Sequence, residues 1–207
     1  MTQSIPAEIG ASIDDVLTPA LIVDLDAFER NLDKMRDLTT ARNVRCRPHA
    51  KTHKSSQIAR LQLARGAVGV CCQTVGEAEV MAAAEIPDIL VTNQIVEEPR
   101  IARAVQLGIR AKVGLCVDDI GRIPVIASLA SRHGVITDIY VEIDVGAARC
   151  GIQPGSAAVG LARRVREFAS LRFAGLHCYN GKVQSIRSYA ERYAAAADVT
   201  ECSHGYE

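Results

Sequence analysis

Short apolar segments alternate with amphipathic stretches along most of the chain. The apolar segments are rich in Val, Ile, Leu and Cys, which is typical of strands buried on both faces of a parallel sheet. In the stretches between them, apolar residues recur at i, i+3 and i+4, which predicts helices, so the alternation indicates βαβ units. The predicted strands are Ala20–Asp26, Val44–Arg47, Val68–Cys72, Ile89–Thr92, Lys112–Val117, Ile139–Val145 and Leu171–Tyr179. The predicted helices are Gly76–Glu85, Glu97–Leu107, Ile120–His133, Ser156–Phe168 and Gln184–Ala197.

Local signals mark several helix ends. Thr74 and Glu77 have the spacing of a capping box, which predicts the start of the helix over 76–85. Gly66, Gly108 and Gly134 stand where helices are expected to stop, because glycine readily adopts the left-handed conformation that ends a helix.

The spacing of the last six predicted strands favours a barrel. Their ends recur about every 26 residues, which is close to the length of one unit of a (β/α)8 barrel. A doubly wound open sheet is the alternative, but the chain has neither a GxGxxG motif after a strand nor a P-loop. We therefore expect an α/β fold with about six of the eight barrel units in residues 18–197, an N-terminal extension over 1–17 and an atypical tail over 198–207. Such an open sheet has two unpaired edges, and we expect a truncated chain.

Composition narrows the class of protein. The 207 residues are 48% hydrophobic and 23% charged, and 24 basic residues balance 24 acidic ones, as in an ordinary soluble globular protein. A neutral balance argues against nucleic acid as a partner, and no apolar run is long enough to span a membrane. The seven cysteines form no CxxC pair, and no basic, apolar leader is visible. We expect reduced thiols and a cytoplasmic location.

The densest group of polar residues follows the first predicted barrel strand. If the strand continues past residue 47, then His49, Lys51 and His53 point the same way, toward the barrel axis. Active sites of such barrels lie at the carboxyl ends of the strands. Neighbouring cations (Arg45, Arg47 and Lys54) disfavour the ammonium form of an inward lysine, and a neutral amine is what Schiff-base chemistry requires. A solvated basic loop is the alternative interpretation.

Other predicted strands end in polar residues at the same edge. Glu142 and Asp144 share one strand face and would point into the barrel, where Arg149 or the lysine cluster could pair with them, either for function or as a structural ion pair. The remaining members of this rim are Gln73, Asn93, Gln94, His177 and Tyr179.

These motifs carry a resemblance to a known family. The order and spacing of Asp24–Asn31, Arg47–Ser55, Gly69–Gln73, Val91–Gln94, Val141–Gly146 and Arg149–Gly151 are similar to those of the D-threonine aldolase, 3-hydroxy-D-aspartate aldolase and D-serine dehydratase group. That group belongs to the alanine racemase-like pyridoxal phosphate enzymes of fold type III. The resemblance extends over about residues 18–197.

The resemblance implies roles for matching residues. Lys51 resembles the lysine that binds pyridoxal phosphate covalently, and Arg149 resembles the arginine that faces its pyridine nitrogen. Tyr179 resembles an active-site tyrosine beside the cofactor, whereas Gln73 and Asn93 resemble residues near the ring. His53 is a candidate for proton transfer. The reaction implied is retro-aldol cleavage of D-threonine or 3-hydroxy-D-aspartate to glycine and an aldehyde.

The resemblance also implies parts that this sequence lacks. Intact relatives use a divalent metal whose ligands lie in a C-terminal β-domain, and they form dimers, so we expect no metal ligands here and a homodimer as one assembly. The tail over 198–207 matches nothing expected after the last helix. Cys202 and His204 are close enough in sequence for a metal-binding pair, but a frameshifted or truncated tail is the favoured interpretation. The alternatives are D-serine dehydratase or amino-acid racemase activity, a non-catalytic pyridoxal phosphate-binding fragment, and an unstable product of truncation.

Overall fold

The computed structural model describes residues 7–204, and the side chains as far as residue 201. The outer ends of the predicted N-terminal extension and of the predicted tail therefore lie outside the described residues, as do the side chains of Cys202 and His204. The chain divides into two compact units, residues 1–44 and 45–207. No helix within residues 7–204 has the length and apolar character needed to cross a membrane.

The first unit contains the short 3-10 helix η1 (Ile13–Asp15) and helix α1 (Leu25–Ala41). The strand predicted over 20–26 is wrong, because this segment has no strand and its end is the start of α1. The Asp24 side chain accepts a hydrogen bond from the Ala27 N–H at 2.9 Å, so a polar cap starts a helix where the apolar run predicts a strand.

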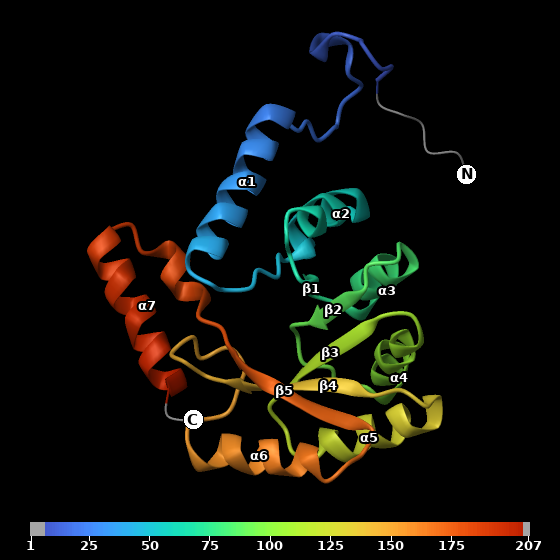
Figure 1. Ribbon diagram of the computed structural model, residues 1–207, viewed down its shortest axis with the longest axis vertical. Helices are drawn as coiled ribbons and strands as arrows, with labels where there is room; N and C mark the ends of the chain where they lie inside the picture. Colours follow the sequence, from blue (N-terminus) through green and yellow to red (C-terminus); the bar gives the residue numbers. More distant parts are fainter. Residues whose placement is uncertain (1–6, 205–207) are drawn as a thin grey trace. The chain divides into compact units, whose positions relative to one another are not determined.

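The second unit is a five-stranded parallel sheet in the order β1-β2-β3-β4-β5 with helices along it (Figure 1). The strands are β1 (Val70–Cys72), β2 (Asp88–Val91), β3 (Lys112–Val117), β4 (Thr137–Ile143) and β5 (Leu171–Cys178). The α-helices are α2 (Ser56–Ala64), α3 (Val75–Ala83), α4 (Glu98–Gln106), α5 (Arg122–His133), α6 (Ser156–Arg166) and α7 (Tyr189–His204). The shorter 3-10 helices are η2 (Ala50–Thr52), η3 (Leu107–Ile109) and η4 (Gly181–Ser185).

The predicted barrel strands are confirmed, apart from the first. The segment over 44–47 forms no regular strand, although it runs beside β1: the Val68 N–H donates to the Cys46 carbonyl at 2.9 Å, and His49 bridges Cys71. If this segment is counted with β1–β5, all six predicted barrel strands have a counterpart in the structure. The first and last strands of the sheet do not pair with each other, so the barrel is open. β5 is an edge strand, and most of its residues are only half-buried.

Helix ends largely follow the local signals. Thr74 caps α3 by accepting from the Glu77 N–H at 3.2 Å, and the Glu77 carboxylate accepts from the Gln73 N–H at 2.7 Å. Gly134 ends α5 in the left-handed conformation, with φ 64°. The helix predicted over 184–197 begins later, at Tyr189, because η4 occupies the preceding turn, and it extends to His204.

A chain of alternating charges crosses the amino ends of the strands. Arg47 contacts Asp88 at 2.8 Å, Asp88 contacts Lys112 at 3.4 Å, Lys112 contacts Asp138 at 3.3 Å, and Asp138 contacts Arg172 at 2.6 Å. The Asp138 side chain is only 3% exposed, so both cations compensate a buried carboxylate. This network fixes the sheet at the end opposite the polar rim.

Six cysteines of the second unit have described side chains, and none of these six is in a disulfide bond. Cys72 and Cys116 are buried, whereas Cys46, Cys71, Cys150 and Cys178 are half-buried.

Candidate functional site

Lys51 lies in a 3-10 turn and not in a strand. The chain leaves the side of β1 at His49 and turns through η2, so the period-two alternation expected past residue 47 is wrong. As a result, His49 and Lys51 face one cavity, while His53 is absent from its lining. The His53 ring instead accepts a hydrogen bond from the Ser55 N–H at 3.0 Å, next to the start of α2.

The hydrogen bonds of His49 determine its tautomer. Nδ1 accepts from the Lys51 N–H at 3.2 Å, so it carries no proton. The Thr92 hydroxyl donates to the Cys72 carbonyl at 3.2 Å, and it therefore accepts from His49 Nε2 at 3.1 Å. Burial lowers the pKa of His49, and nearby Lys51 lowers it further, in agreement with a neutral ring. His49 thus connects the turn that carries Lys51 to β1 and β2.

The cavity beside Lys51 has a volume of about 230 Å³. Four of the residues predicted for the site line it, namely Lys51, Gln73, Arg149 and Tyr179. They come from the carboxyl ends of different strands, as expected for a barrel. Five further residues complete the lining: Arg47, His49, Cys71, Thr92 and His177.

Asn93 does not line this cavity, but it is hydrogen-bonded to Arg149, which does. It lines a neighbouring cavity of about 440 Å³, which shares Gln73 with the first. The Arg149 Nη2 group donates to Asn93 Oδ1 at 2.8 Å. The amide therefore positions the guanidinium group at the edge of the cavity that Lys51 faces.

Asp144 shapes the loop that carries Arg149. Its Oδ1 accepts from the N–H groups of Gly146 and Ala148, both at 3.0 Å, so it does not act as the inward-facing carboxylate that was expected. Gly151 closes the loop with φ +102°, and a Cβ atom there would lie 2.6 Å from the Asp144 nitrogen. A glycine is therefore required where the loop returns to β4.

The loop after β5 is bonded to the loop after β4. Asn180 Nδ2 donates to the Val145 carbonyl at 3.2 Å, and Lys182 Nζ donates to the Gly146 carbonyl at 3.2 Å. A Cβ atom at Gly181 would collide with the Tyr179 hydroxyl group, so glycine leaves space for the phenol ring. These contacts place Tyr179 and Arg149 beside the same cavity.

Two of the cations expected around Lys51 have carboxylate partners. Arg47 forms a two-point ion pair with Asp88, with distances of 2.8 and 3.1 Å, and Lys54 lies 3.5 Å from Glu77. These carboxylates compensate the positive charges of Arg47 and Lys54.

The thiols near the cavity are poor nucleophiles. Burial raises the pKa of Cys71, which lines the cavity, to about 11, and that of Cys72 to about 12. Because the thiolate is the reactive form, these side chains have a packing role.

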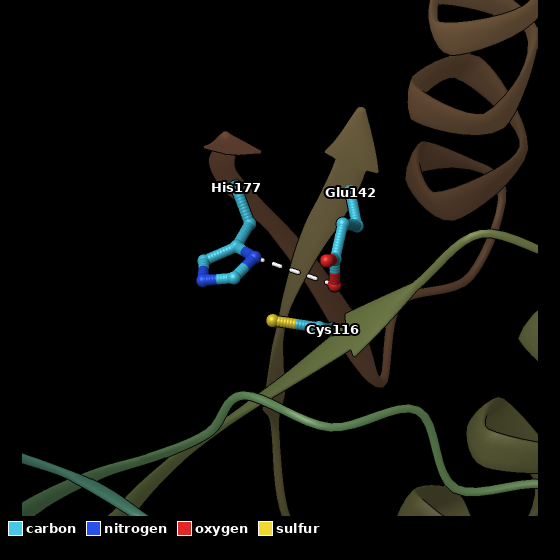
Figure 2. Close-up of side chains that lie close together, drawn as sticks. All are labelled: Cys116, Glu142 and His177. Atoms are coloured by element: carbon cyan, nitrogen blue, oxygen red, sulfur yellow. Dashed lines mark ion pairs between the residues drawn. The ribbon is translucent and has the colours of Figure 1, made fainter. Parts of the chain in front are cut away.

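A second group of polar side chains lies deeper in the sheet. Glu142 and His177 contact each other at 3.3 Å, and Cys116 lies beside them (Figure 2). Gln94 donates a short hydrogen bond to Glu142, so the partners expected for this carboxylate, Arg149 or the lysines, are wrong. The sequence places Glu142 and His177 on the inner face, but Cys116 lies in an apolar run that gives no sign of a polar role.

The fold and this site together define a class of protein. A parallel α/β sheet carries a lysine, an arginine and a tyrosine around one cavity at the carboxyl ends of its strands, which is how (β/α) barrels build sites for small molecules. The chain belongs to the family described as alanine racemase, N-terminal domain, which matches residues 23–205.

Two known proteins of similar sequence are aldolases. The chain is 42% identical to a 3-hydroxy-D-aspartate aldolase of Paracoccus denitrificans (strain Pd 1222), in an alignment that covers 98% of this chain and 54% of that protein. It is 38% identical to a D-threonine aldolase of an Arthrobacter species, covering 97% of this chain and 53% of the relative.

A solved structure supports the same relationship. The crystal structure of D-threonine aldolase from Filomicrobium marinum matches with a TM-score of 0.93 at 48% identity, covering 96% of this chain and 53% of that one. The fold of the alanine racemase-like enzymes is thus confirmed. The chain spans about half the length of the relatives it matches.

Proposed function

We propose that this chain forms the pyridoxal phosphate-binding part of an enzyme that cleaves D-3-hydroxy amino acids, such as D-threonine or 3-hydroxy-D-aspartate, to glycine and an aldehyde. The single observation that carries the proposal is the placement of Lys51 and Arg149 around one cavity. The 42% identity to a 3-hydroxy-D-aspartate aldolase over nearly the whole chain supports it.

The groups around the cavity fit this cofactor. Lys51 supplies the primary amine that an aldehyde requires, and Arg149 supplies donors for a ring nitrogen. Tyr179 and His177 add a phenol and an imidazole to the same lining. When bound, pyridoxal phosphate supplies the electron sink for the pair of electrons left by Cα–Cβ cleavage.

Arg149 would hold the pyridine nitrogen as a hydrogen-bond donor. A guanidinium group does not give up its proton, so Arg149 would leave that nitrogen unprotonated and would make the ring a weaker electron acceptor. Asn93 accepts from Nη2, and Cys150 Sγ accepts from Nη1 at 3.6 Å, so the remaining N–H groups of Arg149 are those that would serve the ligand. Asn93 therefore orients the Arg149 guanidinium group, and Arg149 would set the protonation state of the ring nitrogen.

Tyr179 is the group that we propose for proton transfer with substrate. Both ring nitrogens of His49 are already engaged, so His49 positions the Lys51 turn. His53 lies outside the described lining of the cavity, so a direct role at the substrate is not favoured by this geometry. The Tyr179 side chain lines the cavity and is 37% exposed, within reach of an incoming ligand.

Absorbance spectroscopy tests the cofactor role directly. The purified chain with added pyridoxal phosphate should develop a visible band that is absent in Lys51→Ala. Lys54→Ala is a matched control, because Lys54 lies three residues away, pairs with Glu77 and does not line the cavity. An equal band in all three proteins would contradict the proposal, and circular dichroism would check that each variant is folded.

Product analysis separates the reaction from its alternatives. Glycine and acetaldehyde from D-threonine would identify the retro-aldol reaction, whereas a keto acid and ammonia would identify a dehydratase. Inverted substrate would identify a racemase. A Lys51-dependent band without any product would mean that the chain binds the cofactor but does not catalyse turnover alone.

A further inference from the structure

Three side chains with metal-binding atoms converge inside the sheet, one from each of three neighbouring strands (Figure 2). Cys116 comes from β3, Glu142 from β4 and His177 from β5, and their ligand atoms all lie within 4.8 Å of one another. Cys116 is 3% exposed and Glu142 is 2% exposed. Cys116 and Glu142 are therefore enclosed, while the His177 side chain is 21% exposed and lines the cavity, so the group is not a chance cluster of surface acids.

The strand register explains why the three meet. Glu142 pairs with His177, and Cys116 pairs with Tyr140, two residues before Glu142. Residues two apart in a strand share a face, and paired residues of parallel neighbours lie side by side. Cys116, Glu142 and His177 are thus fixed on the inner face by backbone pairing alone.

The carboxylate of Glu142 has little compensation for its burial. It accepts a short hydrogen bond from Gln94, and its only ionic partner among the described residues is His177. No lysine or arginine in the described part of the chain forms an ion pair with it. A buried carboxylate is costly unless a positive charge lies close by, so the site favours a cation.

His177 Nδ1 faces this carboxylate without bonding to it. The atom is buried and makes no hydrogen bond with any described residue, although Glu142 Oε2 lies 3.3 Å away. Two nitrogen or oxygen ligands of one tetrahedral zinc ion lie about 3.4 Å apart, as bond lengths of 2.0–2.1 Å require. The two atoms therefore have the separation of ligands that share an ion.

We infer that Cys116 Sγ, a Glu142 carboxylate oxygen and His177 Nδ1 form a zinc site with one open position. A soft thiolate and an imidazole select zinc over the hard cations magnesium and calcium. The Gln94 amide bonded to Glu142 supplies the outer contact that fixes a metal-binding carboxylate. The sulfur must move toward the other ligands by about 1 Å, a change of the size that a side-chain rotation produces.

This site is separate from the metal that the family resemblance implies, whose ligands are expected outside this chain. The site shares His177 with the lining of the proposed cofactor cavity, but Lys51, Arg149 and Tyr179 are not among its ligands. Its test therefore needs no pyridoxal phosphate, and either proposal can fail without the other.

Metal binding by the full chain tests the inference. The chain is stripped with a chelator, supplied with one equivalent of zinc or cobalt(II), desalted and analysed for metal by mass spectrometry. We expect one ion per chain, a higher melting temperature with zinc, and with cobalt a sulfur-to-metal charge-transfer band. The band reports directly on a thiolate ligand.

Matched variants separate this site from other metal binding. Cys116→Ser should lose the charge-transfer band and the bound zinc, and Glu142→Gln should lose the zinc. Cys46→Ser should keep both, because Cys46 is a half-buried thiol outside the cluster. Absence of bound zinc in the wild type, or zinc and a band that survive Cys116→Ser, would overturn the inference and leave Glu142 and His177 as an ion pair. Circular dichroism of each metal-free variant would check its fold.

Discussion

The Arg149 guanidinium group donates to the Asn93 side-chain oxygen at 2.8 Å, which joins the loops after β2 and β4 across 56 positions of sequence. The bond fixes a charged group that is otherwise exposed, at the edge of the cavity that Lys51 faces. The site is therefore organised by side chains that support one another between loops.

Removal of the Asn93 acceptor should weaken cofactor binding. Asn93→Ala removes one support of Arg149, and we expect a loss of about 1 kcal/mol, or roughly a fivefold higher Kd for pyridoxal phosphate. Asn93→Asp keeps the acceptor oxygen and should bind the cofactor nearly as well as wild type. Spectroscopic titration measures both, and equal weakening in the two variants would refute the role of the bond.

The Thr92 hydroxyl should matter for the Lys51 turn. Thr92→Val keeps the shape but leaves His49 Nε2 without an acceptor, and we expect it to lower the free energy of unfolding by about 1–3 kcal/mol. Thr92→Ser keeps the hydroxyl and should lose less. Urea unfolding compares the two variants. If Thr92→Val is as stable as Thr92→Ser, the hydrogen bond between His49 and Thr92 does not stabilise the turn.

The buried carboxylate of Asp138 should contribute more to the free energy of unfolding than an exposed ion pair does. Asp138→Asn removes the charge that faces Lys112 and Arg172, and we expect a loss of about 1–3 kcal/mol. Asp37→Asn, whose side chain is 69% exposed beside Arg36, should cost less than about 0.5 kcal/mol. Denaturant unfolding in low salt would reveal the difference, and similar losses would argue against it.

Substitution by alanine should have opposite effects on stability at two of the glycines. A Cβ atom at Gly69 would collide with the Asp88 carbonyl and with Arg47, so Gly69→Ala should destabilise the fold by about 1–3 kcal/mol. Gly160 lies in α6 with nothing near its would-be Cβ atom, so Gly160→Ala should stabilise it by about 0.5–1 kcal/mol. Melting temperatures would decide, and two shifts of the same sign would contradict this packing.

Stability should fall as the pH is lowered below about neutrality. Burial lowers the pKa of both His49 and His53 from the ordinary value of 6.5, so the unfolded chain binds protons more readily. The contribution of these two histidines to the free energy of unfolding is therefore fully present above pH 6.5. It decreases as the pH falls from 6.5 toward the lower pKa values of the folded state. Urea unfolding at several pH values measures the slope.

A histidine variant provides the check on this pH dependence. His53→Gln removes one of the two depressed groups, so its stability should change less between pH 7 and pH 5 than that of the wild type. An unchanged slope in this variant would assign the pH dependence to other groups.

The sequence predicted the sheet better than the connections. The strand over 112–117 follows directly from an apolar run, because burial on both faces admits few polar residues. The strand over 171–178 also follows from its apolar run, although most of its residues are half-buried. The segment over 20–26 has similar composition but leads into a helix, because the Asp24 cap decides its end. The first barrel segment pairs with β1 without forming a regular strand.

The candidate site was predicted in part. The sequence placed Lys51, Gln73, Arg149 and Tyr179 at one rim, because carboxyl ends of parallel strands share an edge, and these four do line one cavity. It also pointed His53 inward, since alternation was extended past the end of a strand. The 3-10 turn over 50–52 breaks that alternation, so His49 and Lys51 line the cavity and His53 does not.

Sequence alone determined the order of the elements and the residue types at the rim, because hydrophobic periodicity and local capping are short-range properties. Tertiary structure decided the partners: Arg149 with Asn93, His49 with Thr92, and Glu142 with His177. These residues are between 35 and 56 positions apart, and their contacts depend on strand register and on the path of each loop. Register and loop path are set by the packing of the whole sheet, which no local pattern contains.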